Sequence, residues 1–345
     1  MQIAFLSLVF SLSHSHKFGI RISPQKDLAG PRTMDNLNPS GIETAGIKMI
    51  AVCGGKYKVW TKRMGKGDVK CLLLHGGPGS SHDYLECFES FLPQAGIEMY
   101  YYDQLGAGNS DRPEDESLWN LDRYLDEVEE VRQGLALTDF VLYGHSWGGI
   151  LTMEYALRYQ HDGHLRAIVI SNMVSSIDAI LASAAKWKGI LPADILRKVD
   201  EIEEKEDWDN PEYEKIMMDH LYPKMVCRLQ PWPEPVTRGF RLMNQQIYVQ
   251  MQGHSEFVVT GNLRGWTCHD RLHNITLRTL VIGAQNDEVT PEDCKKMAEV
   301  LPNAEVVICP QGSHMVSLLH ASTVPVASSS CDLRTKWLTF FWGDV

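Results

Sequence analysis

Residues 144–148 read Gly-His-Ser-Trp-Gly, and a different kind of sequence lies on each side of them. The apolar run at residues 140–143 is typical of a short buried strand, and residues 149–159 carry apolar side chains at helical spacing. A serine at such a strand-to-helix turn lies on a strained backbone that exposes its Oγ above the sheet. The flanking glycines are needed because the turn brings strand and helix close together. The pattern predicts that Ser146 is a nucleophile, and the alternative is a turn with only a structural role.

Short apolar runs that predict β-strands recur along the chain, and most of them are separated by a helix-like segment. Two alternating runs around Gly54-Gly55 predict a hairpin near the start of the fold. Strands that alternate with helices imply a mostly parallel sheet with right-handed crossovers. Strands that are apolar throughout imply that helices cover both faces, so the predicted fold class is α/β. The predicted strands are residues 48–52, 57–62, 70–74, 98–102, 140–143, 166–170, 279–282 and 305–308.

The pattern changes between residues 175 and 271, where strand-like runs give way to long amphipathic segments rich in aromatic residues and methionine. We expect a helical insertion here that covers the mouth of the sheet, and we call residues 175–271 the cap. A chain of 345 residues fits one large α/β domain with a smaller inserted one. The remaining expected parts are a disordered leader at 1–40, a core in two parts at 41–174 and 272–320, and an atypical tail at 321–345.

A serine hydroxyl becomes a good nucleophile only when a base takes its proton and a third group orients that base. In a strand–serine–helix arrangement of this kind, the acid and then the histidine follow the serine along the chain. Asp287 follows the predicted strand at 279–282 and is the expected acid, with Glu288 and Asp293 as weaker alternatives. His314 follows the next predicted strand and is the expected base.

The tetrahedral intermediate of such a reaction needs hydrogen-bond donors for its oxyanion. The backbone N–H of Trp147, the residue after the nucleophile, is one expected donor, and the second should come from the loop after an early strand. The glycine-rich residues 75–79 occupy that place, and glycines let a carbonyl oxygen approach the backbone closely. Gly77 is the expected second donor, with Gly76 as the alternative.

Three blocks of sequence together resemble one enzyme family. They are His-Gly-Gly-Pro-Gly at 75–79, Asp-Gln-Leu-Gly-Ala-Gly-Asn-Ser at 103–110, and Gly-His-Ser-Trp-Gly-Gly at 144–149. The chain resembles the proline iminopeptidases, which are serine aminopeptidases with the α/β-hydrolase fold, and the resemblance covers about residues 41–315. The second block is the most selective, because general esterases and epoxide hydrolases seldom carry its glutamine. The resemblance implies a mostly parallel central sheet with helices on both faces and an inserted helical cap.

The resemblance also implies a serine aminopeptidase that releases an N-terminal residue, often proline, from a short peptide or an amino-acid amide. In such enzymes carboxylates of the inserted domain bind the free α-ammonium of the substrate. Glu256 matches that pattern, Glu234 is a second candidate and Glu214 a third. The alternative for each is an ordinary exposed carboxylate. No metal or organic cofactor is expected.

Two other functions stay open on the sequence alone. The same three side chains would serve a general esterase, amidase or lactonase that acts on a small metabolite. A catalytically silent binding protein of the same fold is the second alternative. Chemistry that starts from an aspartate nucleophile, as in haloalkane dehalogenases and epoxide hydrolases, is excluded because position 146 is serine.

Composition limits the partners and the compartment. Thirty-three basic and 44 acidic residues give a formal net charge of −11, which disfavours binding to nucleic acid. Eight scattered cysteines without a C-x-x-C pair suggest free thiols in a reducing compartment, so we expect a cytoplasmic protein. Secretion is the alternative, because residues 3–12 are apolar, although this run is too short to span a membrane.

The last part of the chain departs from the family pattern. After Met315 the family has an acidic loop and a final amphipathic helix, whereas residues 321–330 are small and rich in serine and residues 335–342 are rich in aromatic side chains. If this tail replaces the final helix, the loop that carries His314 loses packing.

Overall fold

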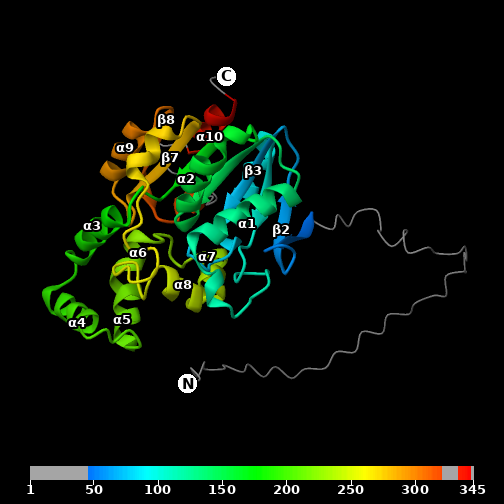
Figure 1. Cartoon of the computed structure of the whole chain (residues 1–345). Helices are drawn as coiled ribbons and strands as arrows, with labels where there is room; N and C mark the ends of the chain where they lie inside the picture. Colours follow the sequence, from blue (N-terminus) through cyan, green and yellow to red (C-terminus); the bar gives the residue numbers. More distant parts are fainter. Residues whose placement is uncertain (1–45, 321–332, 343–345) are drawn as a thin grey trace, which may run out of the picture. The chain divides into compact units, whose positions relative to one another are not determined.

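The computed structural model describes residues 46–320 and 333–342, which contain one eight-stranded sheet with helices around it (Figure 1). The strand order is β1-β2-β4-β3-β5-β6-β7-β8. Strand β2 pairs antiparallel with β1 and β4, and all other neighbours are parallel. The strands are β1 (Ile47–Val52), β2 (Tyr57–Met64), β3 (Val69–Leu74), β4 (Ile97–Tyr102), β5 (Phe140–His145), β6 (Leu165–Ser171), β7 (Arg278–Asn286) and β8 (Ala304–Ser313).

Each strand predicted from the sequence is present, and the prediction of an α/β fold with a mostly parallel sheet is confirmed. The order of strands reverses direction beside β3, because β4 lies on one side of it and β5 on the other. Ligands of open α/β sheets bind outside the carboxyl ends of the strands at such a reversal. The loop after β3 and the turn after β5 meet there, since Leu74 and Gly144 are register partners.

Both faces of the sheet are buried, as apolar strands require. Along β3, Leu72 and Leu74 point into one core while Cys71 and Leu73 point into the other. The first core is completed by α1 (Leu121–Gly134), α2 (Trp147–Tyr159) and α9 (Pro291–Val300), and the second by η2 (Asp83–Ser90) and α10 (Leu333–Trp342). The remaining short helical turns before α3 and after α8 are η3 (Pro93–Ala95), η4 (Glu116–Leu118), η5 (Gln160–Asp162), η7 (His269–Asn274) and η8 (Val316–His320).

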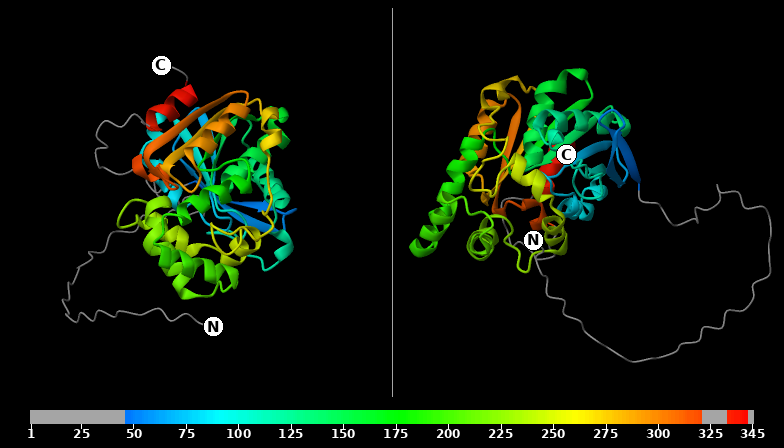
Figure 2. Two further views of the ribbon diagram at one scale, coloured as in Figure 1. Left: turned by 90° about the vertical axis from the view of Figure 1, so that its left-hand side faces the viewer. Right: turned by 60° about the horizontal axis from the view of Figure 1, so that its bottom comes forward.

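The segment between β6 and β7 is built from helices, most of which gather at one end of the sheet (Figures 1 and 2). Arg238 ties this segment to the core, because its guanidinium pairs with Asp83 and, at 2.5 Å, with Glu86 on η2. The helices are α3 (Ile177–Lys188), α4 (Ala193–Glu204), α5 (Pro211–Ile216), the π-helical turn η6 (Met217–Leu221), α6 (Tyr222–Met225), α7 (Glu234–Leu242) and α8 (Gln245–Met251).

A helix, α10, lies within the tail whose sequence departs from the family pattern. Helix α10 buries Trp337 and Phe340 completely or nearly so, and the Trp337 ring lies 5.4 Å from the Tyr143 ring and 5.5 Å from the Phe88 ring. Arg278 on β7 donates a hydrogen bond of 2.6 Å to the carbonyl oxygen of Phe340. The tail therefore supplies a terminal helix that packs on the sheet.

Three expectations fall on residues outside the described ranges: the leader, the apolar run at 3–12 and the Ser-rich stretch at 321–330. Within residues 46–320 and 333–342, no helix combines the length and the apolar character needed to cross a bilayer.

Candidate active site

Ser146 lies at the turn between β5 and α2 with φ 56° and ψ −125°. A non-glycine residue in this region of φ/ψ space stores about 1–3 kcal/mol of strain, which the surroundings must hold in place. They do so through close packing, because a Cβ on Gly144 would overlap the carbonyl oxygen of Gly148, and a Cβ on Gly148 would overlap that of Leu74. The backbone N–H of Ser146 donates to the carbonyl oxygen of Ser171 at 3.0 Å. The turn predicted from the five-residue motif is present.

Asp287 and His314 lie at the carboxyl ends of β7 and β8 and form a hydrogen bond of 2.8 Å between Oδ1 and Nδ1. The second carboxylate oxygen of Asp287 accepts from the side-chain amide of Asn172 at 2.6 Å, and its backbone oxygen accepts from the indole of Trp187 at 2.7 Å. Asp287 is therefore fixed from three sides. Ser146 and His314 line the same cavity, so the structure brings the three predicted catalytic side chains to one place.

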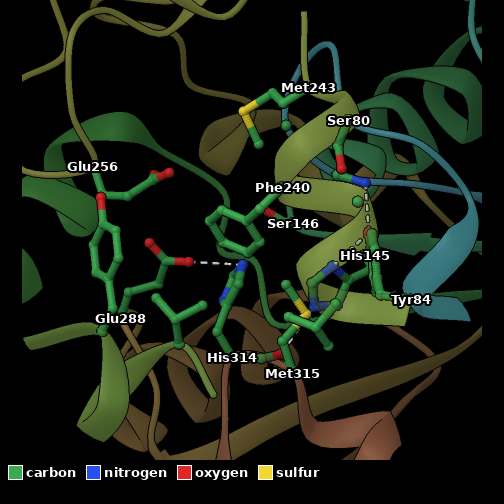
Figure 3. A pocket seen from close by; sticks show the side chains of 16 residues that line it. Ser80, Tyr84, His145, Ser146, Phe240, Met243, Glu256, Glu288, His314 and Met315 are labelled. Carbon is green, nitrogen blue, oxygen red and sulfur yellow. Dashed lines mark hydrogen bonds and ion pairs between the residues drawn. The ribbon is translucent and has the colours of Figure 1, made fainter. Parts of the chain in front are cut away.

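The other ring nitrogen of His314 is also occupied. Nε2 lies 2.7 Å from Oε1 of Glu288, the residue directly after Asp287 (Figure 3). Burial alone would lower the pKa of His314, but the carboxylates of Glu288 and Asp287 outweigh it and hold the pKa well above its usual value. Within the described residues, no hydrogen bond joins Ser146 to His314. The sequence suggested Glu288 only as an alternative to Asp287.

The existing hydrogen bonds show which of the two candidate oxyanion donors in the loop after β3, Gly76 or Gly77, has a free backbone N–H. The backbone N–H of Gly76 donates to the hydroxyl of Tyr84 at 2.6 Å, so it is not available to a substrate. In the part of the chain that the structure describes, no hydrogen bond uses the backbone N–H of Gly77 or of Trp147. Gly77 has φ 112°, a conformation that favours glycine, and its bond to Pro78 is cis.

Gln104 holds the oxyanion loop against the catalytic turn. Its side-chain oxygen accepts from the indole N–H of Trp147 at 2.8 Å, and its side-chain nitrogen donates to the carbonyl oxygen of His75 at 3.0 Å. Its backbone N–H also donates to Nε2 of His75 at 3.0 Å. The glutamine that makes the second sequence block selective therefore links the other two blocks.

His145 connects the same loop to His314. Its Nε2–H donates to the carbonyl oxygen of His314 at 2.9 Å, so its Nδ1 accepts from the Tyr84 hydroxyl at 3.0 Å. This tautomer is neutral, because burial and the neighbouring His314 lower the pKa of His145 to about 3. Tyr84 and His145 thus position the loops that carry Gly77 and His314; Tyr84 lies outside the sequence motifs, and His145 lies within the motif around Ser146 but was given no role.

The cavity beside Ser146, together with the solvent at its mouth, spans about 550 Å³, and apolar residues of the cap such as Phe240 and Met243 line it (Figure 3). A second space of about 380 Å³ continues from it between Trp147, Ile150, Met173, Ile177 and Ile180. Both spaces reach Ser146, His314 and the carboxylates of Glu256 and Glu288. An apolar cavity with a few converging polar groups is the usual form of a small-molecule site.

Glu256 reaches this cavity from the loop after α8, and the Tyr248 hydroxyl donates to its carboxylate. Burial and the neighbouring Glu288 raise the pKa of Glu256 to about 8. Among the described residues, Glu256 has no cationic partner, and the one cation beside Glu288 is His314. The cavity thus offers two adjacent carboxylates to a positively charged group.

Known proteins match this chain over most of its length. A family model described as the alpha/beta hydrolase fold matches residues 72–321. A proline iminopeptidase of Chitinophaga pinensis is 44% identical over 273 residues, covering 76% of this chain and 89% of that protein. One from Flavobacterium johnsoniae is 41% identical over 271 residues, with the same coverage. The crystal structure of the Mycobacterium smegmatis proline iminopeptidase superposes with a TM-score of 0.75 at 26% identity, covering 85% of this chain and 97% of that one.

The chain belongs to the proline iminopeptidase family of α/β-hydrolases.

Two residues expected to bind substrate in this family member lie elsewhere. The Glu234 side chain is 65% exposed and pairs with Arg238 at 2.8 Å, outside the cavity, because it stands at the solvent-facing start of α7. Glu214 is exposed on α5. The structure therefore does not bring Glu234 to the cavity, whereas Glu288 lines it together with Glu256. Asp293, the other alternative acid, accepts from the Thr290 hydroxyl at 2.6 Å at the start of α9.

Proposed function

We propose that this proline iminopeptidase family member is a serine aminopeptidase that releases an N-terminal residue of the proline type from short peptides or amino-acid amides. The observation that carries the proposal is the pair of carboxylates, Glu256 and Glu288, in the same cavity as Ser146. Burial without a cationic partner disfavours the charged form of Glu256 and raises its pKa to about 8, and the free α-ammonium of a peptide would stabilise that charged form. One charged hydrogen bond of this kind contributes about 1.5–3 kcal/mol.

In the proposed mechanism, Ser146 attacks the scissile carbonyl carbon while His314 takes the Oγ proton at Nε2. Asp287 holds the imidazole through Nδ1 and stabilises the imidazolium. The backbone N–H groups of Gly77 and Trp147 stabilise the oxyanion, and the loss of one such donor typically costs about 2.7–4 kcal/mol of barrier. His314 then protonates the leaving amine, and water releases the acyl group.

The two connected spaces suit the two halves of such a substrate. An aminopeptidase has only one residue before the scissile bond, so its acyl side can be closed, whereas the leaving peptide continues outward. We assign the smaller apolar space beside Ile150, Met173 and Ile177 to the N-terminal side chain. We assign the larger space under Phe240 and Met243 to the leaving group.

Turnover of proline and alanine β-naphthylamides by the purified protein tests this function, with Ser146→Ala as the control. The proposal expects hydrolysis that the Ala variant lacks, and preference for the proline compound. Equal turnover by the Ala variant, or efficient cleavage of neutral esters with none of either naphthylamide, refutes it. The second result would favour an esterase or lactonase of the same fold.

We also propose a reducing, cytoplasmic location. Cys71, Cys227, Cys268 and Cys294 support it, because they are buried free thiols. Secreted proteins usually pair their cysteines.

A further inference from the structure

The catalytic base of this site is held in a form that cannot act. Both ring nitrogens of His314 lie within hydrogen-bond distance of a carboxylate, Nδ1 at 2.8 Å from Asp287 and Nε2 at 2.7 Å from Glu288. Carboxylates accept and do not donate, so a ring between two of them carries a proton on each nitrogen. Such an imidazolium has no lone pair with which to take the proton of Ser146.

Glu288 lies within reach of both His314 and Glu256. It stands in the loop between β7 and α9, and its only ion pair within the described residues is the one with His314. Its carboxylate faces the same cavity as Glu256 (Figure 3). Glu256 is held by the Tyr248 hydroxyl, and it would bind one side of an incoming ammonium. Glu288 would meet the other side of that ammonium, and only after it leaves Nε2.

We propose that Glu288 is a substrate-operated gate on the catalytic base, occupying Nε2 of His314 in the free protein and turning to the substrate's ammonium when that group arrives. This inference rests on the proposed function, since it takes the cation from the aminopeptidase substrate. Once Glu288 is neutralised by the ammonium, the Nε2–H proton passes to water and leaves a neutral imidazole. The Oγ proton of Ser146 then moves to Nε2 as the Oγ–C bond forms and the carbonyl electron pair moves to oxygen.

The gate makes activation of His314, and not only binding, depend on the cationic end of the substrate. A substrate without a cationic end leaves Glu288 on Nε2, so it meets a protonated base even when it fits the cavity. If Glu288 instead only stabilised the imidazolium formed during the reaction, its removal would slow every reaction of Ser146. The two roles therefore predict opposite effects of one substitution on a neutral reagent.

Inactivation by phenylmethanesulfonyl fluoride measures the activation of Ser146 without an ammonium. In this reaction the serine Oγ–S bond forms and the S–F bond breaks, with fluoride as the leaving group. The second-order rate constant near pH 7 is compared among the wild type, Glu288→Gln and Glu288→Ala. Two controls are Glu256→Gln, which removes the neighbouring carboxylate, and Glu292→Gln, which removes an exposed one on α9. Thermal unfolding checks that each variant is folded.

The gate predicts that both Glu288 variants react about tenfold faster than the wild type, because removing the Glu288 carboxylate lowers the pKa of His314 and leaves more neutral imidazole near pH 7. Glu292→Gln keeps the wild-type rate, and Glu256→Gln gains less than the Glu288 variants. An equal or lower rate in folded Glu288→Gln and Glu288→Ala overturns the gate, as does an equal gain in Glu256→Gln. Turnover of the prolyl naphthylamide is measured separately. Its absence refutes the proposed function, whereas the inactivation rates test the gate.

Discussion

Replacing Glu256 by glutamine removes a negative charge from the cavity while keeping the shape of the side chain. If Glu256 binds the substrate's ammonium, the variant loses one charged hydrogen bond, which is worth about 1.5–3 kcal/mol. Since about 1.4 kcal/mol corresponds to a factor of ten, kcat/KM for a prolyl naphthylamide should fall about 10- to 150-fold. Hydrolysis of a neutral ester of similar size should change little, because it presents no cation.

The loss should also depend on pH, with a sign fixed by the pKa of Glu256. Burial and Glu288 raise that pKa to about 8. Below it, Glu256 of the free protein is protonated and resembles glutamine, so wild type and variant should converge as the pH falls. Above it, the wild-type carboxylate is charged and the difference reaches its full size.

The assay is kcat/KM for the prolyl naphthylamide from pH 6 to 9, with Glu234→Gln as the matched control. Glu234 is also a glutamate of the cap, but it is exposed and lies outside the cavity. A loss in Glu256→Gln that is the same at every pH, or equally large for the neutral ester, refutes the assigned role. A comparable loss in Glu234→Gln would refute it too.

Trp337→Ala should lower the free energy of unfolding in urea by about 3–5 kcal/mol, because Trp337 is fully buried. A decrease below about 1 kcal/mol would show that α10 does not pack as described. Tyr84→Phe leaves the Gly76 N–H without its acceptor, so it should cost about 1–3 kcal/mol of stability. It should also lower kcat more than it raises KM. An unchanged kcat would contradict the role of Tyr84 in positioning the loop that carries Gly77. Glu288 and Asp287 raise the pKa of His314 in the free protein, so kcat/KM should be lost as the pH falls through that raised pKa. In the substrate complex the bound ammonium neutralises Glu288 and the pKa of His314 is lower, so kcat should be lost only at a lower pH. Coinciding acidic limbs would contradict that ordering.

The sequence was sufficient for the scaffold and for the order of the three catalytic candidates. Strands β5, β7 and β8 end at the same edge of a parallel sheet, so residues placed directly after them converge without any knowledge of side-chain contacts. Ser146, Asp287 and His314 each follow such a strand. Local pattern and sheet topology therefore carry this part of the prediction.

The carboxylates of the cavity could not be predicted in the same way. Glu234 and Glu256 both occur in the helical segment beside aromatic residues, and only the fold turns one to solvent and the other to Ser146. Glu288 was considered only as a weaker alternative to Asp287 for the acid. The loop after β7 directs Asp287 and Glu288 to opposite nitrogens of one ring, which spacing alone does not reveal.

The comparison with the family pattern left open whether a terminal helix is present. Trp337 and Phe340 are three residues apart, a helical spacing that places both on one face, and both are buried. That spacing was visible in the sequence. Tyr84 and His145 gave no such signal, since their roles depend on contacts between loops that are distant along the chain.

The central claim is that His314 activates Ser146. Mass spectrometry of the intact protein after reaction with a fluorophosphonate, followed by peptide mapping, tests this most directly. The wild type should form a single adduct on Ser146, and His314→Ala should form it at least about 100-fold more slowly, the smaller limit of what a general base contributes. Labelling of folded His314→Ala at the wild-type rate, or an adduct on another residue, would contradict the account.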